Sequence, residues 1–295
     1  MKTYVHISDL HFGAHGAAAR VQQLEEYLQE AVPSEGDAPQ HYTFILTGDA
    51  VDSPTKANIA KYQDFSAWLE ETSGTTPLFV LGNHDVNPHG LAFWRNNQIL
   101  AESAGNYPKI VKDDEAKAIF LLFDSNIGGL LAQGKIGREQ MDTMAALLKK
   151  YKRLKSYTLV AVLHHHLVPV DESSSKNSTW WRRLIPDWLE RLIPGLLEET
   201  VELRDAAEFI DFLKAHKVGY VLHGHKHLQF LKEYKGIHII ACGSSSARPY
   251  QGDPSKTCLS YNVLGFTKKE LVCAQCADNL DGAGLHVVRS VCFPR

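Results

Sequence analysis

Residues 44–52 read FILTGDAVD, an apolar run that leads into a polar turn with two aspartates. A short apolar run of this kind is typical of a strand that is buried on both faces. Similar runs recur along the chain at Tyr4–Ile7, Leu78–Leu81, Ala118–Phe123, Leu159–Leu163, Tyr220–Leu222 and Ile237–Ala241. Segments with helical spacing of apolar residues separate them, around Val21–Leu28, Ile59–Leu69, Met141–Tyr151 and Phe209–Leu213. Alternating strands and helices predict an α/β domain.

The length of the chain and two breaks in the alternation of strands and helices refine this prediction. The chain has 295 residues, 44% of them hydrophobic, which is enough for one large globular domain or one domain with an insertion. Residues 171–204 interrupt the alternation, and short strand-like pieces follow residue 256. We therefore expect a single domain over residues 1–295, with an amphipathic helical insertion at about 171–204 and a strand-rich C-terminal part from about 256.

Composition argues against several classes of protein. The formal net charge of −3 gives no sign of the basic stripe that is usual in nucleic-acid-binding proteins. The N-terminus lacks a signal-peptide pattern, and no stretch approaches the ~20 apolar residues of a membrane span, so we expect a soluble, cytoplasmic protein. The five cysteines do not suggest a disulfide framework. Cys273 and Cys276 form a C-x-x-C, which is read either as a metal or redox pair or as partly buried free thiols.

Potential metal ligands follow five of the predicted strands. They are Asp9-Leu10-His11, Gly48-Asp49-Ala50-Val51-Asp52, Gly82-Asn83-His84-Asp85, His164-His165-His166 and His223-Gly224-His225-Lys226-His227. Taken singly, each is explained as a cap, a turn or a hydrogen-bonded histidine. In α/β sheets, however, ligands gather at the carboxyl ends of strands, so the five groups favour one shared site.

The residue types narrow the chemistry of that site. Carboxylate, imidazole and amide ligands without a thiolate suit Mn, Fe, Zn or Co better than calcium. A carboxylate shared by two ions allows a site with two metals ~3.5–4 Å apart, which can activate a water and stabilise charge in an in-line displacement.

The blocks DLH, GDAVD, GNHD, HHH and GHKH, in this order, resemble the calcineurin-like metallophosphoesterase superfamily over roughly residues 3–246. The resemblance implies an α/β/β/α sandwich of two mixed β-sheets flanked by helices, with a simple doubly wound sheet as the alternative. It also implies a binuclear phosphoric ester hydrolase with two divalent or trivalent metal ions, Mn, Fe or Zn. Its first metal would be held by Asp9, His11 and His227, its second by Asn83, His164 and His225, and Asp49 would bridge both.

The same resemblance assigns the catalytic groups. His84 would face the substrate, and Asp85 would orient His84. Because neighbouring side chains on a strand point to opposite sides, one histidine of the triple is favoured as ligand. We choose His164, with His165 as the alternative and His166 either supporting a ligand or in a structural role.

Departures from subfamily patterns bear on the substrate. Ser53-Pro54 after the second block counts against Ser/Thr protein phosphatases, Asp52 against purple acid phosphatases, and His84 against UDP-diacylglucosamine hydrolases. The pattern is closest to bacterial members that resemble cyclic nucleotide phosphodiesterases. It implies hydrolysis of cyclic nucleotides or other small phosphodiesters through a metal-bridging hydroxide. The alternative is a phosphomonoesterase; a nuclease and an inactive scaffold fit the pattern less well.

The insertion has its own pattern. Between residues 180 and 197, apolar residues recur at helical spacing opposite several charged ones, with Pro186 and Pro194 as expected breaks. Three interpretations remain: an apolar face packed on the core, a homodimer contact or lid near the site, and a membrane-surface helix. Glu198 and Glu199 argue against the last.

Overall fold

A computed structural model describes residues 2–31, 42–87, 106–128, 133–151, 154–168, 203–247, 258–267, 270–278 and 285–294. It contains two six-stranded sheets. The first has the order β12-β11-β10-β1-β2-β3. Its strands are β1 (Lys2–Ile7), β2 (Tyr42–Thr47), β3 (Leu78–Val80), β10 (Ser260–Phe266), β11 (Glu270–Asp278) and β12 (Leu285–Pro294). β1, β2 and β3 are parallel, whereas β10 to β12 join antiparallel, so the sheet is mixed.

The second sheet has the order β4-β5-β6-β7-β9-β8. Its strands are β4 (Lys109–Asp113), β5 (Ala118–Leu122), β6 (Thr158–Val162), β7 (Tyr220–His223), β8 (Phe230–Tyr234) and β9 (Ile237–Ala241). The four central strands are parallel, and β4 and β8 pair antiparallel at the two edges. The carboxyl ends of the parallel strands of each sheet therefore form a platform for polar loops.

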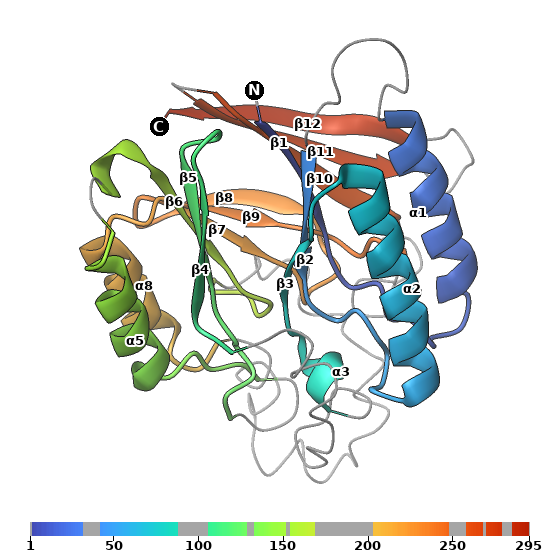
Figure 1. The fold of residues 1–295 in the computed structure, drawn as a ribbon, viewed down its shortest axis with the longest axis horizontal. Coiled ribbons are helices and arrows are strands. Elements are labelled where there is room, and N and C mark those ends of the chain that lie inside the picture. The colour runs from blue at the N-terminus through green and yellow to red at the C-terminus, as the bar shows by residue number, and fades with distance from the viewer. Residues whose placement is uncertain are drawn as a thin grey trace, which may run out of the picture.

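Helices cover the outer faces of both sheets. α1 (Ala17–Ala31) and α2 (Lys56–Ser73) pack on the first sheet, and α5 (Arg138–Leu148) and α8 (Ala206–Ala215) pack on the second (Figure 1). Two short elements, α3 (Asn83–Val86) and the 3₁₀ turn η3 (Leu154–Ser156), complete the described helices. The Thr55 hydroxyl caps the start of α2, and Gly74 ends it in the left-handed conformation.

Three apolar layers hold these elements together. One lies between the two sheets, and each of the others lies between a sheet and its helices. Tyr4, Phe120 and Phe266 meet in the layer between the sheets, with ring centroids 4.9–6.0 Å apart. The predicted α/β/β/α sandwich of two mixed sheets is confirmed, and the simple doubly wound alternative is wrong.

Two strands were absent from the sequence prediction. β4 reads KIVKD and β8 reads FLKEY, and both are half-buried edge strands with charged side chains. Edge strands carry such residues because one side remains in water, so they lack the continuous apolar run that marks a central strand. Nearly all of the predicted insertion at 171–204, including residues 180–197, lies outside the described residues, so its helices and its dimer contact stay predictions.

The cysteine pair lies on one strand but faces two layers. Cys273 packs between the sheets, whereas Cys276 packs on the helix side of the first sheet. Side chains on opposite faces cannot join in a disulfide or share a zinc ion, which favours buried free thiols. Among the described residues, no helix combines the length and the apolarity that crossing a membrane requires.

Candidate metal centre

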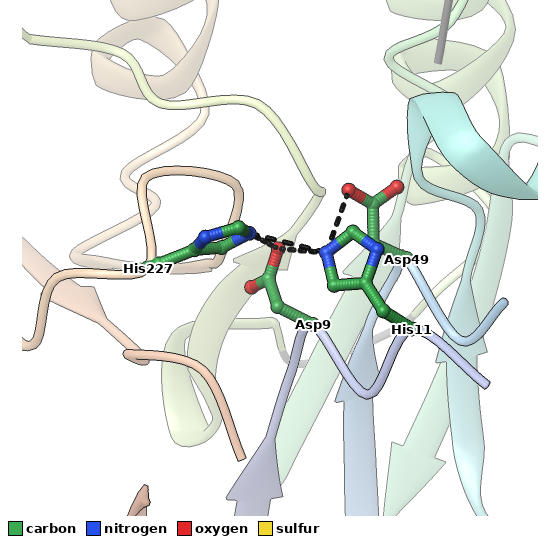
Figure 2. Close-up of side chains that lie close together, drawn as sticks. All are labelled: Asp9, His11, Asp49 and His227. Atoms are coloured by element: carbon green, nitrogen blue, oxygen red, sulfur yellow. Dashed lines mark hydrogen bonds and ion pairs between the residues drawn. The ribbon is translucent and has the colours of Figure 1, made fainter. Parts of the chain in front are cut away.

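The five polar blocks meet where the carboxyl ends of β1, β2 and β3 face those of β6 and β7. Two of the side-chain groups that form there share Asp49, and a third, of His11, Asp52 and His84, adjoins them. Figure 2 shows the first group, Asp9, His11, Asp49 and His227, with their polar atoms directed toward one another. A second group contains Asp49, His164 and His225. The structure therefore brings the residues predicted from five separate blocks into one place.

The first group is compact around the imidazole of His11. Its Nε2 lies 3.1 Å from Nε2 of His227 and 3.6 Å from Oδ2 of Asp49. Nε2 of His227 lies 3.4 Å from Oδ1 of Asp9. The ligand atoms of these four side chains all lie within 4.8 Å of one another, close enough to share one ion.

The amide oxygen of Asn83 lies between the two histidines of the second group, and we count Asn83 with that group from here on. This Oδ1 lies 3.1 Å from Nε2 of His164 and 3.1 Å from Nδ1 of His225. Nε2 of His164 lies 3.4 Å from Oδ2 of Asp49. The same Asp49 oxygen thus faces a histidine of each group.

The backbone of these residues is unusual. Five of the seven predicted ligands have positive φ angles: Asp9 (54°), His11 (48°), Asp49 (51°), His225 (75°) and His227 (53°). A non-glycine residue in this left-handed region costs ~1–3 kcal/mol and persists only where the surroundings enforce it. The concentration of this conformation in one cluster of polar residues indicates a functional site.

Two glycines allow the loops to approach one another. A Cβ on Gly82 would lie 2.2 Å from Oδ1 of Asp49, and a Cβ on Gly224 would lie 2.5 Å from Oδ2 of Asp9. Real Cβ atoms do not reach such distances, so any larger residue would push a candidate ligand away. This explains why glycine begins the motifs GNHD and GHKH.

A hydrogen bond fixes the orientation of His164. Its Nδ1 donates to the carbonyl oxygen of Thr47 at 2.6 Å, so Nε2 carries the lone pair in the neutral ring. That lone pair faces two oxygen acceptors, those of Asp49 and Asn83. Such an arrangement requires either a proton or a cation between the atoms.

The pKa values of His164 and Asp49 also favour a cation between these side chains. Burial lowers the pKa of His164, but the Asp49 carboxylate, together with Asp9 and the Thr47 carbonyl, outweighs burial and raises that pKa to about 9. Burial raises the pKa of Asp49, yet His164 and His84 reverse this and hold the Asp49 pKa well below its ordinary value. An ionised Asp49 beside nitrogen and amide ligands is what a metal ion needs, and the ion would replace the proton on His164.

Distances between the donor atoms also fit metal ions. Two nitrogens that each lie ~2.1 Å from one ion are ~3.0–3.4 Å apart at octahedral or tetrahedral angles. His11 and His227 approach to 3.1 Å, and so do His164 and His225. The residues that are present therefore suit two ions with Asp49 between them.

The three consecutive histidines have separate environments. His164 belongs to the second group, whereas Nδ1 of His165 lies 2.8 Å from the Ser125 hydroxyl. His166 is buried and stacks on the ring of His225, with centroids 5.7 Å apart. This geometry favours His164 as the ligand, in line with the proposal made from the sequence.

His84 stands beside the first group. Its ring lies 4.7 Å from that of His11, and its Nδ1 lies 2.8 Å from the carbonyl oxygen and 3.9 Å from Oδ1 of Asp52. Oδ1 of Asp52 also lies 3.7 Å from Nδ1 of His11. Asp52 therefore faces both rings, a role that the sequence analysis did not assign to it. Its place in the motif GDAVD was the available signal.

Asp85 has a different environment from the one expected. Its carboxylate accepts the N–H groups of Gly82 at 2.8 Å and Val51 at 3.0 Å. Burial and the nearby Asp49 raise the pKa of Asp85 to about 7 against the opposing effect of these N–H groups. The group that faces His84 Nδ1 comes from Asp52, so Asp85 acts on the Gly82 turn and not on the His84 ring.

A family comparison matches residues 2–229 to the profile of the calcineurin-like phosphoesterases. The chain belongs to this family. As a metallophosphoesterase it is a metal-dependent hydrolase of phosphate esters, and the Asp/His cluster is where its metal would bind. No curated protein matches the sequence significantly.

Comparison with solved structures finds similar chains at low sequence identity. A dimetal phosphatase from Danio rerio superimposes with a TM-score of 0.63 and 12% identity, covering 99% of this chain and 98% of that one. Vps29 from Cryptosporidium parvum reaches a TM-score of 0.48 and 14% identity, covering 100% and 98%. The phosphopantetheinyl hydrolase of Mycobacterium tuberculosis also reaches 0.48 and 14%, covering 86% and 97%.

Proposed function

We propose that this metallophosphoesterase is binuclear and hydrolyses small phosphodiesters, with cyclic nucleotides as the leading substrate class. The observation that supports it most is the position of Asp49 Oδ2, 3.6 Å from His11 Nε2 and 3.4 Å from His164 Nε2. One carboxylate oxygen between two groups of nitrogen ligands suits a carboxylate that is shared by two ions.

The side chains divide the work in this proposal. Asp9, His11 and His227 hold one ion, Asn83, His164 and His225 hold the other, and Asp49 contacts both. When bound, the two ions would supply Lewis acidity, activating a water and neutralising charge on the phosphoryl oxygens. Mn, Fe and Zn are the metals that this mixture of imidazole, carboxylate and amide ligands suits best.

His84 donates a proton to the leaving group. Since Nδ1 donates to the Asp52 carbonyl oxygen, Nε2 is the nitrogen that can pass a proton to substrate. The bond to the Asp52 carbonyl oxygen orients the ring, and the Asp52 carboxylate lies 3.9 Å from the same Nδ1. Protonation helps most when the leaving group is an alkoxide, as in a cyclic nucleotide, which favours the diesterase over an enzyme for activated esters.

A phosphomonoesterase is the second candidate. Its support is the similarity to the Danio rerio dimetal phosphatase, whose fold spans nearly the whole of both chains. The diesterase and the monoesterase share the same metal ligands, so only the substrate distinguishes them.

Hydrolysis of a small panel tests the proposal. The panel holds cyclic nucleotides, a chromogenic diester and monoesters, each assayed with Mn²⁺, Fe²⁺, Zn²⁺ and Mg²⁺. We expect metal-dependent turnover, with cyclic nucleotides preferred over monoesters. A His216→Ala variant, altered at the C-terminal cap of α8 and away from the site, should keep the wild-type profile. Turnover of monoesters alone would favour the second candidate, and full activity after chelation would refute both.

A further inference from the structure

Three consecutive serines lie directly behind the metal centre. Ser244, Ser245 and Ser246 follow β9, and all three are buried. Burying a hydroxyl is unfavourable unless it forms a hydrogen bond, so buried consecutive serines indicate defined partners. Their partners include the loop that carries Asp9.

Two of the hydroxyls donate to one acceptor. Oγ of Ser244 lies 2.9 Å from the Asp9 carbonyl oxygen, and Oγ of Ser246 lies 3.1 Å from the same atom. Both lone pairs of that oxygen are thus directed at serine donors. The middle serine differs, because its Oγ donates to the Ser260 carbonyl oxygen at 2.8 Å.

Ser245 attaches this segment to the strands of the first sheet. Its N–H donates to the Ser8 carbonyl oxygen at 2.8 Å, and its hydroxyl accepts the Ser8 N–H at 3.1 Å. Together with the bond to Ser260 on β10, these contacts hold residues 244–246 at a fixed distance from β1. The two other serines are thereby held against Asp9.

The Asp9 carbonyl is a sensitive place for such contacts. Because the peptide group is planar, fixing this oxygen fixes the Asp9–Leu10 peptide, and with it the direction in which His11 leaves the turn. Asp9 and His11 both have left-handed backbones, at φ 54° and 48°. The Asp9 N–H donates to Gly48 and the Asp9 carboxylate accepts the His225 N–H, so the serines complete the restraint on this residue.

We propose that Ser244 and Ser246 are positioning residues, whose hydroxyls hold the Asp9 peptide so that Asp9 and His11 aim at one ion together with His227. The inference rests on the proposed binuclear function. It assigns to this segment a role toward the ion of Asp9, His11 and His227, because both hydroxyls donate to the Asp9 carbonyl oxygen.

The test is Mn²⁺ binding by a Ser244→Ala, Ser246→Ala double variant. Removing an outer partner of a metal ligand typically costs ~10–100-fold in metal affinity. We expect one of two Mn²⁺ sites to weaken by ~10–100-fold and the other to remain, in a calorimetric titration. The electron paramagnetic resonance signal should change from that of a coupled pair to that of a single ion at intermediate Mn²⁺.

Ser73→Ala is the matched control. The Ser73 hydroxyl is also buried and donates to a backbone carbonyl, that of Leu69, but it lies on α2. It should lower the melting temperature without altering either Mn²⁺ site.

If the double variant does not fold, the single variants, which each keep one donor to Asp9, must show the same selective weakening. Two Mn²⁺ sites of wild-type affinity in the folded variants would overturn the inference while leaving the proposed function intact. A wild-type protein that binds fewer than two Mn²⁺ would overturn both.

Discussion

Replacing Asp49 with asparagine is expected to abolish binding of both ions and with it hydrolysis. Oδ1 of Asp49 accepts the backbone N–H of His84 at 2.9 Å, and Oδ2 faces the rings of His11 and His164. An asparagine that keeps the first contact places its NH₂ group where the bridging oxygen stood. The two donors would then satisfy the histidine lone pairs but repel a cation.

The expected loss of activity exceeds the ~10–100-fold that follows removal of an outer partner, because the site loses a charge and a shared ligand. Metal content after loading with Mn²⁺, measured by mass spectrometry, should fall from two ions per chain toward none. The exposed Asp142→Asn on α5 removes the same charge away from the site and should retain both ions. Wild-type activity and metal content in Asp49→Asn would contradict the assignment of the bridging carboxylate.

Replacing His84 with alanine is expected to lower kcat by ~10²–10⁴-fold while metal content stays unchanged. The side chain of His84 lies next to the first group, but its ring nitrogen bonds to Asp52 and not to the candidate ligands. Proton transfer matters most for a poor leaving group, so the loss on a cyclic nucleotide should exceed the loss on a nitrophenyl ester.

Companion variants separate the two aspartates near His84. Asp52→Asn should reproduce part of the loss, with the same dependence on the leaving group, because Asp52 faces the ring. Asp85→Asn should lower the melting temperature, because Asp85 binds backbone N–H groups of the Gly82 turn. Equal losses on both esters would show that His84 acts mainly on the phosphoryl oxygens, and loss of metal would place it among the ligands.

The central strands were predictable because a strand that is buried on both faces has a run of apolar residues in its sequence. FILT of β2 and LVAV of β6 are examples, and their polar successors marked the site. The edge strands β4 and β8 were missed because one side of each lies in water. The short helix α3 was missed because its four residues, Asn83–Val86, are too few to show a helical period.

The sequence shows the candidate ligands but not the contacts that support them. Asp9, Asp49 and the histidines stand in recognisable blocks, whereas the partner of His84 depends on how two loops approach one another. The left-handed backbones of Asp9 and His225 likewise depend on tertiary contacts, because this conformation is uncommon even for Asp and His, which are enriched in it. The contacts of Ser244 and Ser246 join residues more than two hundred positions apart, beyond any local pattern.

The most direct test of the binuclear proposal is a crystal structure of the protein with Mn²⁺, measured at a wavelength where manganese scatters anomalously. The proposal predicts two anomalous peaks separated by ~3.5–4 Å with Asp49 between them. One peak should lie ~2.0–2.3 Å from ligand atoms of Asp9, His11 and His227, and the other from those of Asn83, His164 and His225. A single peak, or a second ion bound by His165 with His164 remote, would contradict it.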